Sequence, residues 1–193
     1  MNQDDRSEAP ARELENVAEV AGEAGQLLIE AYRITLPVTN RATSTTYNIT
    51  YGPIHKDVVQ ATATKGSLIL AKGRLYKDPK YESGEVLIRG WNPEVYLSKA
   101  TPEDASKPPT GRVIGFVTQL LPRNLVEICI ISTYNDKEYE NTLPLGLSSR
   151  VRRQFRSRVH IGFKIRAKLV LAGEKYYPWD GTPRIDDFSI LKE

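Results

Sequence analysis

Apolar and polar residues alternate most regularly between positions 159 and 171. One set of alternate positions is entirely apolar: Val159, Ile161, Phe163, Ile165, Ala167, Leu169 and Leu171. The positions between them are glycine or basic: His160, Gly162, Lys164, Arg166 and Lys168, with Val170 as the exception. Because successive side chains of a β-strand point to opposite faces, this period of two predicts a long strand with one buried face.

Shorter apolar segments on either side of this one predict four more strands. They cover residues 112–120, 125–133, 138–143 and 184–191. Between the third and fourth strands of the series, Ser148 or Ser149 can cap a helix that runs to about Ser157. Three apolar residues share one face of that helix: Leu147, Val151 and Phe155.

Three strands, a helix and two more strands over residues 111–193 resemble the OB-fold, a five-stranded barrel with a helix between its third and fourth strands. The long alternating strand, the variable loop at 173–183 and the short closing strand add to this resemblance. The resemblance is architectural, because OB-folds share little sequence. It predicts a mostly β protein with a C-terminal OB-like barrel. The alternatives are another small barrel, or one continuous sheet to which residues 58–99 contribute strands.

The first 110 residues have a less regular pattern of apolar and polar positions. We divide them into segments by local composition. Residues 11–33 are strong helix formers with apolar residues at three- and four-residue steps, which favours an acidic amphipathic helix. The other segments are a disordered acidic leader (1–10), an irregular connection (34–57), a β-hairpin segment (58–100) and a Pro-rich linker (101–110).

The net charge of +3 conceals a strong asymmetry along the chain. Residues 1–36 hold eight acidic residues and three basic ones, whereas no acidic residue occurs between Asn141 and Gly173. Eight basic residues lie in that acid-free window: Arg150, Arg152, Arg153, Arg156, Arg158, Lys164, Arg166 and Lys168. A block of one sign attracts an anionic partner.

Within this block, Lys164, Arg166 and Lys168 share a strand face at intervals of about 6.8 Å, twice the rise of a strand. This interval is close to the spacing of phosphates along an extended single strand of nucleic acid. Aromatic residues in the following loop offer surfaces on which bases could stack, at roughly 1–3 kcal/mol each. The residues predicted to bind single-stranded nucleic acid are Arg123, Arg150, Arg153, Arg156, Lys164, Arg166, Lys168, Tyr176, Tyr177 and Trp179.

Each part of this set has an ordinary structural interpretation. The helix arginines could form a solvated surface, and the aromatic loop at 176–179 could close one end of the barrel. The main alternative function is a structural or adaptor subunit. Residues 125–131 are apolar on both strand faces apart from Glu127, and residues 112–121 are nearly so. Something would therefore cover the barrel: residues 58–99, the N-terminal helix or another chain. A protein partner would then bind through the N-terminal helix or the outer barrel face.

The inventory of reactive residues predicts no catalytic site, no metal site and no cofactor. His55, His160 and Cys129 lie far apart in sequence and lack the spacing of a metal motif. Asp186 and Asp187 are neighbours on a predicted strand, so their side chains are expected on opposite faces. The single cysteine, the acidic N-terminus and the lack of a segment of about 18 apolar residues predict an intracellular protein, cytoplasmic or nuclear, with no membrane partner.

Overall fold

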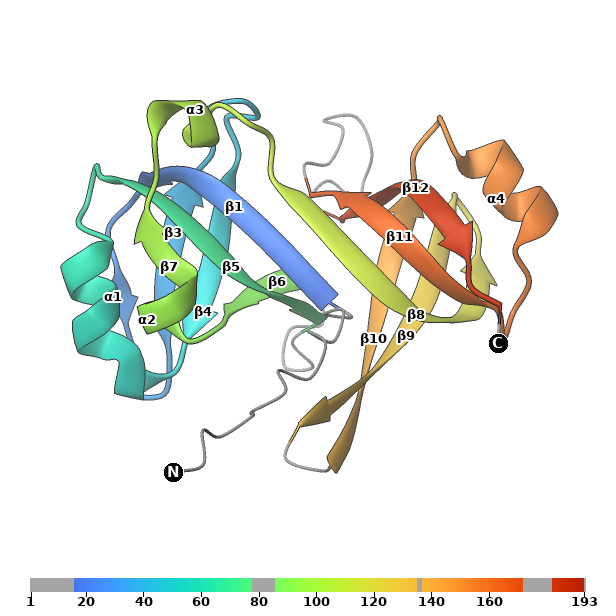
Figure 1. Ribbon diagram of the computed structural model, residues 1–193, viewed down its shortest axis with the longest axis horizontal. Coiled ribbons are helices and arrows are strands. Elements are labelled where there is room, and N and C mark those ends of the chain that lie inside the picture. The colour runs from blue at the N-terminus through green and yellow to red at the C-terminus, as the bar shows by residue number, and fades with distance from the viewer. Residues whose placement is uncertain (1–15, 78–85, 135–136, 172–181, 193) are drawn as a thin grey trace, which may run out of the picture.

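Two five-stranded β-barrels lie side by side in the computed structural model, which describes residues 16–77, 86–134, 137–171 and 182–192 (Figure 1). In each barrel a short helix follows the third strand. The first strand of one barrel runs beside the first strand of the other, and the helices α1 and α4 lie at the two far sides of the molecule.

The strands of the N-terminal barrel are β1 (Asn16–Ala24), β3 (Ile34–Thr39), β4 (Thr46–Tyr51), β5 (Leu68–Lys77) and β6 (Val86–Gly90). They close in the order β1–β3–β4–β6–β5–β1, and every pair is antiparallel except β4–β6. Between β4 and β5 lie the 3-10 turn η1 (Pro53–His55) and helix α1 (Lys56–Thr62). Three short elements flank the barrel: β2 (Leu28–Ile29), α2 (Pro93–Tyr96) and β7 (Leu97–Lys99).

The C-terminal barrel repeats this arrangement. Its strands are β8 (Thr110–Leu121), β9 (Leu125–Tyr134), β10 (Lys137–Leu147), β11 (Lys164–Val170) and β12 (Arg184–Ile190), and helix α4 (Arg152–Arg158) precedes β11. They close in the order β8–β9–β10–β12–β11–β8, and only β10–β12 is parallel. Three strands, a helix and two strands that close in this order form an OB-fold. The expected closed five-stranded barrel is confirmed, and it is accompanied by a second barrel that was not predicted.

The helix predicted over residues 11–33 is wrong where the structure describes it. Residues 16–24 form strand β1 and residues 28–29 form β2. Residues 1–15, including the predicted leader, lie outside the described residues. Ala18, Val20 and Ala24 point into the barrel core, so a period of two is present within the same residues that suggested a helical stripe. An N-terminal docking helix therefore has no basis in residues 16–33.

The irregular connection predicted over residues 34–57 is also wrong, because β3, β4 and η1 occupy most of it. Leu36 of β3 and Ile49 of β4 are fully buried in the core. In residues 58–100, β5 and β6 do pair antiparallel, as a hairpin requires. They are nevertheless two of the five strands of a closed barrel and do not form a separate segment.

A glycine stands at the bend of each barrel's first strand. A side chain at Gly22 of β1 would collide with the backbone of Thr39 on β3, and one at Gly115 of β8 would collide with the backbone of Cys129 on β9. In both barrels the second strand thus crosses so close to the first that only a residue without a Cβ fits. The equivalent glycines are a further sign that the two halves of the chain have one architecture.

The barrels are joined by backbone pairing between β1 and β8, whose antiparallel register runs from Asn16↔Val113 to Glu19↔Thr110. The Asn16 side chain also accepts a hydrogen bond from Leu75 N (2.9 Å) and donates one to Leu75 O (2.8 Å). From the other barrel, Asn141 Nδ2 donates to the same Leu75 oxygen at 2.8 Å. Within the described residues all strands therefore belong to one 12-stranded sheet, as the continuous-sheet alternative required.

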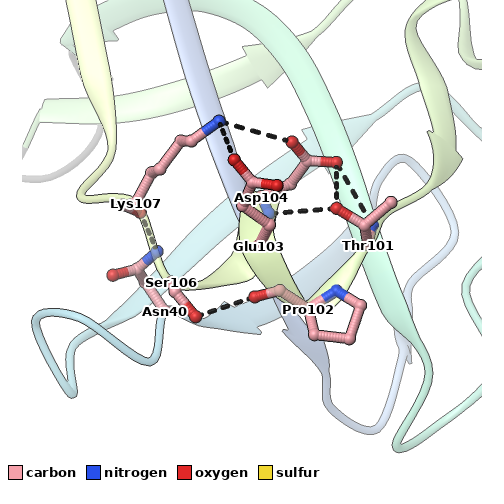
Figure 2. Close-up of polar contacts among 7 residues, drawn as sticks. All are labelled: Asn40, Thr101, Pro102, Glu103, Asp104, Ser106 and Lys107. Atoms are coloured by element: carbon pink, nitrogen blue, oxygen red, sulfur yellow. Dashed lines mark hydrogen bonds and ion pairs between the residues drawn. The ribbon is translucent and has the colours of Figure 1, made fainter.

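The segment predicted as a Pro-rich linker, residues 101–110, connects the barrels and packs against the first of them (Figure 2). It contains α3 (Pro102–Ala105), where Thr101 and Asp104 form a reciprocal capping box. After the helix, the Lys107 carbonyl accepts a 2.8 Å hydrogen bond from Asn40 Nδ2. Asn40 is fully buried and also donates to Ala21 O at 2.8 Å, so one side chain fastens the connection to β1.

The alternating segment predicted as a strand over residues 159–171 is confirmed only from Lys164 onward. Ile165, Ala167 and Leu169 are buried as expected, but Ile161 is 64% exposed and Phe163 is 37% exposed. Gly162 has a φ of +91°, which produces a turn between α4 and β11 and takes the residues before it out of the strand. The buried role expected of Phe163 is therefore wrong.

Helix α4 begins later than predicted, at Arg152, and its N-cap residue Val151 makes no side-chain cap. The Ser148 hydroxyl hydrogen-bonds Asp186 Oδ1 at 3.0 Å and does not cap the helix. Val151 and Phe155 of the predicted apolar face are buried at the N-cap and within the helix, whereas Leu147 is buried as the last residue of β10. Among the described residues, no helix is long and apolar enough to cross a membrane.

Candidate functional site

A row of basic side chains lies on the outer face of β11. Ile165, Ala167 and Leu169 fill the barrel, so Lys164, Arg166 and Lys168 point outward. The neighbouring strand β8 places Phe116, Ile114 and Arg112 opposite them in register. The Lys164 ammonium lies 5.5 Å from the centre of the Phe116 ring, a cation–π distance. We call Arg112, Lys164, Arg166 and Lys168 the C-terminal basic stripe.

One end of the stripe borders a depression of about 580 Å³ at the junction of the barrels, formed by β1, β8, β11 and β12. Arg112, Lys168 and Arg150 line it together with Glu19, Asp186 and Asp187. Two of its acidic residues are paired: Asp186 Oδ2 lies 3.6 Å from Arg150 Nη1, and Glu19 Oε2 lies 3.2 Å from Lys72 Nζ. The depression is thus a site of mixed charge whose cations are concentrated toward β8 and β11.

The two aspartates in this depression contradict the expectation that their side chains point to opposite faces. The register between β11 and β12 shifts between Lys168 and Leu169, so that Asp187 lies opposite Lys168 while Asp186 is left without a partner on β11. A bulge of this kind breaks the alternation of side chains, which explains why both carboxylates line one depression.

The remaining predicted basic residues fall into a different part of the barrel. Arg153 and Arg156 are exposed on α4, and Arg156 Nη2 donates to Leu121 O at 3.2 Å, at the far end of β8. Arg123 follows in the turn between β8 and β9, with a φ of 59°. The stripe, by contrast, lies along the first half of β8. The structure therefore brings Arg123 near Arg156 but does not bring them to the stripe.

The aromatic residues predicted to stack on bases, Tyr176, Tyr177 and Trp179, lie outside the described residues. Other aromatic rings do border the stripe. Phe163 and His160 pack edge to face, with ring centres 5.2 Å apart, in the turn directly before β11, and Phe116 lies under Lys164. Sequence reasoning missed these residues as surface candidates because the alternating pattern assigned Phe163 to the core.

The outer face of β9 and β10 differs in charge from the stripe. Its outward positions are Glu127, Cys129 and Ile131 on β9 and Glu138, Glu140, Thr142 and Pro144 on β10. Glu127 is held by the hydroxyl of Thr118, which donates to its carboxylate at 2.8 Å. OB-folds commonly bind ligands over their second and third strands. In this barrel that face is acidic, and the basic residues lie over the fourth strand instead.

The described residues contain no group of three or more His, Cys, Asp or Glu side chains that could hold a metal ion. Cys129 is partly buried on the outer face of β9. His55 and His160 belong to opposite barrels, on η1 and after α4, and do not meet.

No protein-family model matches the chain, and no curated protein matches its sequence significantly. Its backbone does match that of the wild-type single-stranded DNA binding protein from Thermus aquaticus, with a TM-score of 0.60, 11% identity and coverage of 92% of this chain and 93% of that one. A deletion variant of the same protein gives a TM-score of 0.59 at 12% identity, over 92% and 95% of the two chains.

The two proteins share a fold. The likeness covers more than nine-tenths of both chains, so it is not limited to one of the two barrels. At this level of identity the likeness concerns the backbone only, so what this chain binds must be argued from its own surface.

Proposed function

We propose that this protein is a non-catalytic binding module for single-stranded nucleic acid, and that the C-terminal basic stripe contacts the phosphates. The observation that carries the proposal is the outward projection of Lys164, Arg166 and Lys168 from one strand of an OB barrel, with Arg112 in register beside them. Side chains on one face of a strand repeat at about 6.8 Å. An extended single strand can therefore place successive phosphates along the stripe.

Two further observations support this function. Phe163 and Phe116 border the stripe and offer ring surfaces for bases, and base–aromatic stacking contributes roughly 1–3 kcal/mol per base whatever the sequence. In addition, the Thermus aquaticus protein of the same fold is a single-stranded DNA binding protein by name. We propose that Arg150, Arg123, Arg153 and Arg156 act as outlying phosphate contacts, and that Tyr176, Tyr177 and Trp179 supply additional stacking surfaces.

The salt dependence of binding tests this proposal. Each phosphate contact on a single strand contributes about −0.7 to the slope of log affinity against log salt concentration. Replacing Lys164, Arg166 and Lys168 together by Gln should therefore flatten the slope by about 2.1. Fluorescence anisotropy with labelled single-stranded DNA and RNA at a series of salt concentrations measures this slope.

Two control variants show whether a change in slope is specific to the basic residues of β11. Replacing three exposed lysines of the N-terminal barrel, Lys56, Lys65 and Lys99, by Gln changes the net charge equally but should leave the slope close to that of the wild type. Phe163→Ala should lower the affinity without changing the slope, since stacking releases no counterions. If the wild-type protein shows no single-strand binding at low salt, the proposal is wrong, and a protein-binding adaptor becomes the better hypothesis.

A further inference from the structure

The N-terminal barrel also carries basic residues on its outer face, at positions that sequence analysis did not single out. Arg74 on β5 and Arg89 on β6 lie directly opposite each other in the antiparallel register. Arg74 is half-buried and Arg89 is exposed. Like charges placed opposite each other on neighbouring strands are destabilising, so this pair needs a physical explanation.

The electrostatics of the pair favour an anion. Burial lowers the pKa of Arg74, and the positive charge of Arg89 lowers that pKa further. A guanidinium nonetheless stays charged at physiological pH. Among the described residues, no carboxylate forms an ion pair with either arginine. A phosphate between the two guanidinium groups would accept hydrogen bonds from both and remove the repulsion.

This arginine pair lies in line with the C-terminal basic stripe. Lys168 is opposite Arg112 in the β8–β11 register, and Arg112 is opposite Val17 in the β1–β8 register. Ala18 pairs with Gly73, and the Asn16 side chain bonds the backbone of Leu75. Val17, which lies between Asn16 and Ala18, is therefore beside Arg74.

A single row thus crosses five strands on one face: Lys168, Arg112, Val17, Arg74 and Arg89. Four steps between strands about 4.8 Å apart span roughly 19 Å. This length corresponds to about three intervals between phosphates on an extended strand, taking the roughly 6.8 Å repeat used above. The row begins at the depression of about 580 Å³ between the barrels, which Arg112, Val17 and Lys168 line.

An aromatic residue stands beside the arginine pair. Tyr76 is two residues beyond Arg74 on the same face of β5, and its hydroxyl lies 3.3 Å from Thr50 Oγ1 on β4. This hydrogen bond holds the ring across β6, the strand that separates β5 from β4. A base attached to a phosphate at Arg74 and Arg89 could therefore stack on a ring that is already oriented.

From this row we infer that a bound single strand crosses from the C-terminal barrel to the N-terminal barrel, where Arg74 and Arg89 hold a phosphate and Tyr76 receives a base. The inference rests on the proposed function and extends it to a second binding site. Two acidic residues near the row are paired with cations outside it, Glu19 with Lys72 and Asp186 with Arg150. Asp187 lies opposite Lys168 in the β11–β12 register. The same row argues against a second copy of the chain as the occupant, because a face-to-face contact would oppose like charges.

The test compares salt slopes for a single-stranded oligonucleotide of about 16 nucleotides, the upper end of the site size of one OB-fold. Arg74→Gln with Arg89→Gln should flatten the slope by about 1.4, and this pair combined with the three substitutions in β11 should flatten it by about 3.5. Lys56→Gln with Lys99→Gln is the charge-matched control and should leave the slope unchanged. Circular dichroism and light scattering should show that all variants are folded and have the same mass.

The outcomes separate this inference from the proposed function. If the wild type does not bind, the proposed function fails. If the substitutions in β11 flatten the slope while those at Arg74 and Arg89 do not, the crossing path alone is wrong. A change in molecular mass in the Arg74 and Arg89 variant, without a change in slope, would assign the pair to self-association and also overturn the path.

Discussion

Replacing Phe155 by alanine is expected to lower the free energy of unfolding by roughly 3–5 kcal/mol, as truncation of a core aromatic residue does. Phe155 is fully buried on α4, and its ring packs edge to face against Phe188 of β12, with ring centres 4.9 Å apart. Alanine would leave a cavity where the helix closes one end of the C-terminal barrel. Urea denaturation followed by circular dichroism measures the loss.

Phe163→Ala is the matched control, because it removes the same side chain from the same barrel. Phe163 is 37% exposed and contacts His160 in the turn before β11, so we expect a loss of less than about 1 kcal/mol. Equal losses at the two positions would contradict the assignment of Phe163 to the surface. They would restore the strand over residues 159–171 that the alternating pattern predicts.

Asn40→Ala is expected to cost roughly 2–4 kcal/mol, on the basis of about 1–3 kcal/mol for each buried polar group left without a partner. Asn40 is fully buried. Its Nδ2 donates to the carbonyls of Ala21 and Lys107, both at 2.8 Å, and its Oδ1 accepts from Thr43 N at 3.0 Å. The substitution thus removes the partner of three backbone groups at once, which thermal or urea unfolding would register.

Asn48→Ala supplies the same chemical change at an exposed position of β4 and should alter stability by less than about 0.5 kcal/mol. Faster proteolysis within residues 101–110 of the Asn40 variant is also expected, since Asn40 fastens that connection through Lys107 (Figure 2). A variant that unfolds like the wild type and resists proteolysis equally would show that the connection is held by α3 alone.

The C-terminal barrel could be predicted from the sequence because apolar positions recur strongly and regularly along its strands. The apolar positions of β11 from Ile165 onward, the apolar segment of β9 and the face that contains Phe155 each specify a buried side locally. The outward placement of Lys164, Arg166 and Lys168 followed from the same alternation, because fixing the buried side of a strand also fixes its outward side. Arg112 joins them only through the pairing of β8 with β11. Phe163 was misassigned because the pattern continues across Gly162, whose positive φ ends it.

The N-terminal barrel could not be predicted in the same way. Its strands depend more on pairing with distant strands than on a local pattern of apolar and polar residues. In β1 the core positions are occupied by Ala18, Val20, Gly22 and Ala24, which include good helix formers. Val20 and Ala24 also fit a helical stripe, because they are four residues apart. Gly22 is required by the close approach of the Thr39 backbone on β3, a segment distant in the chain. The local sequence does not indicate this requirement.

The sequence by itself thus determined the inward face of β11 from Ile165 onward and the three basic residues that share its outward face. Only the tertiary structure decided which of the predicted basic residues meet. Arg123 and Arg156 lie at one end of β8 and the stripe lies at the other, because the curvature of a barrel separates segments that are close in the chain. The row from Lys168 to Arg89 depends on the pairing of β1 with β8. That pairing is set by the register between two distant strands and not by the pattern of residues within either strand.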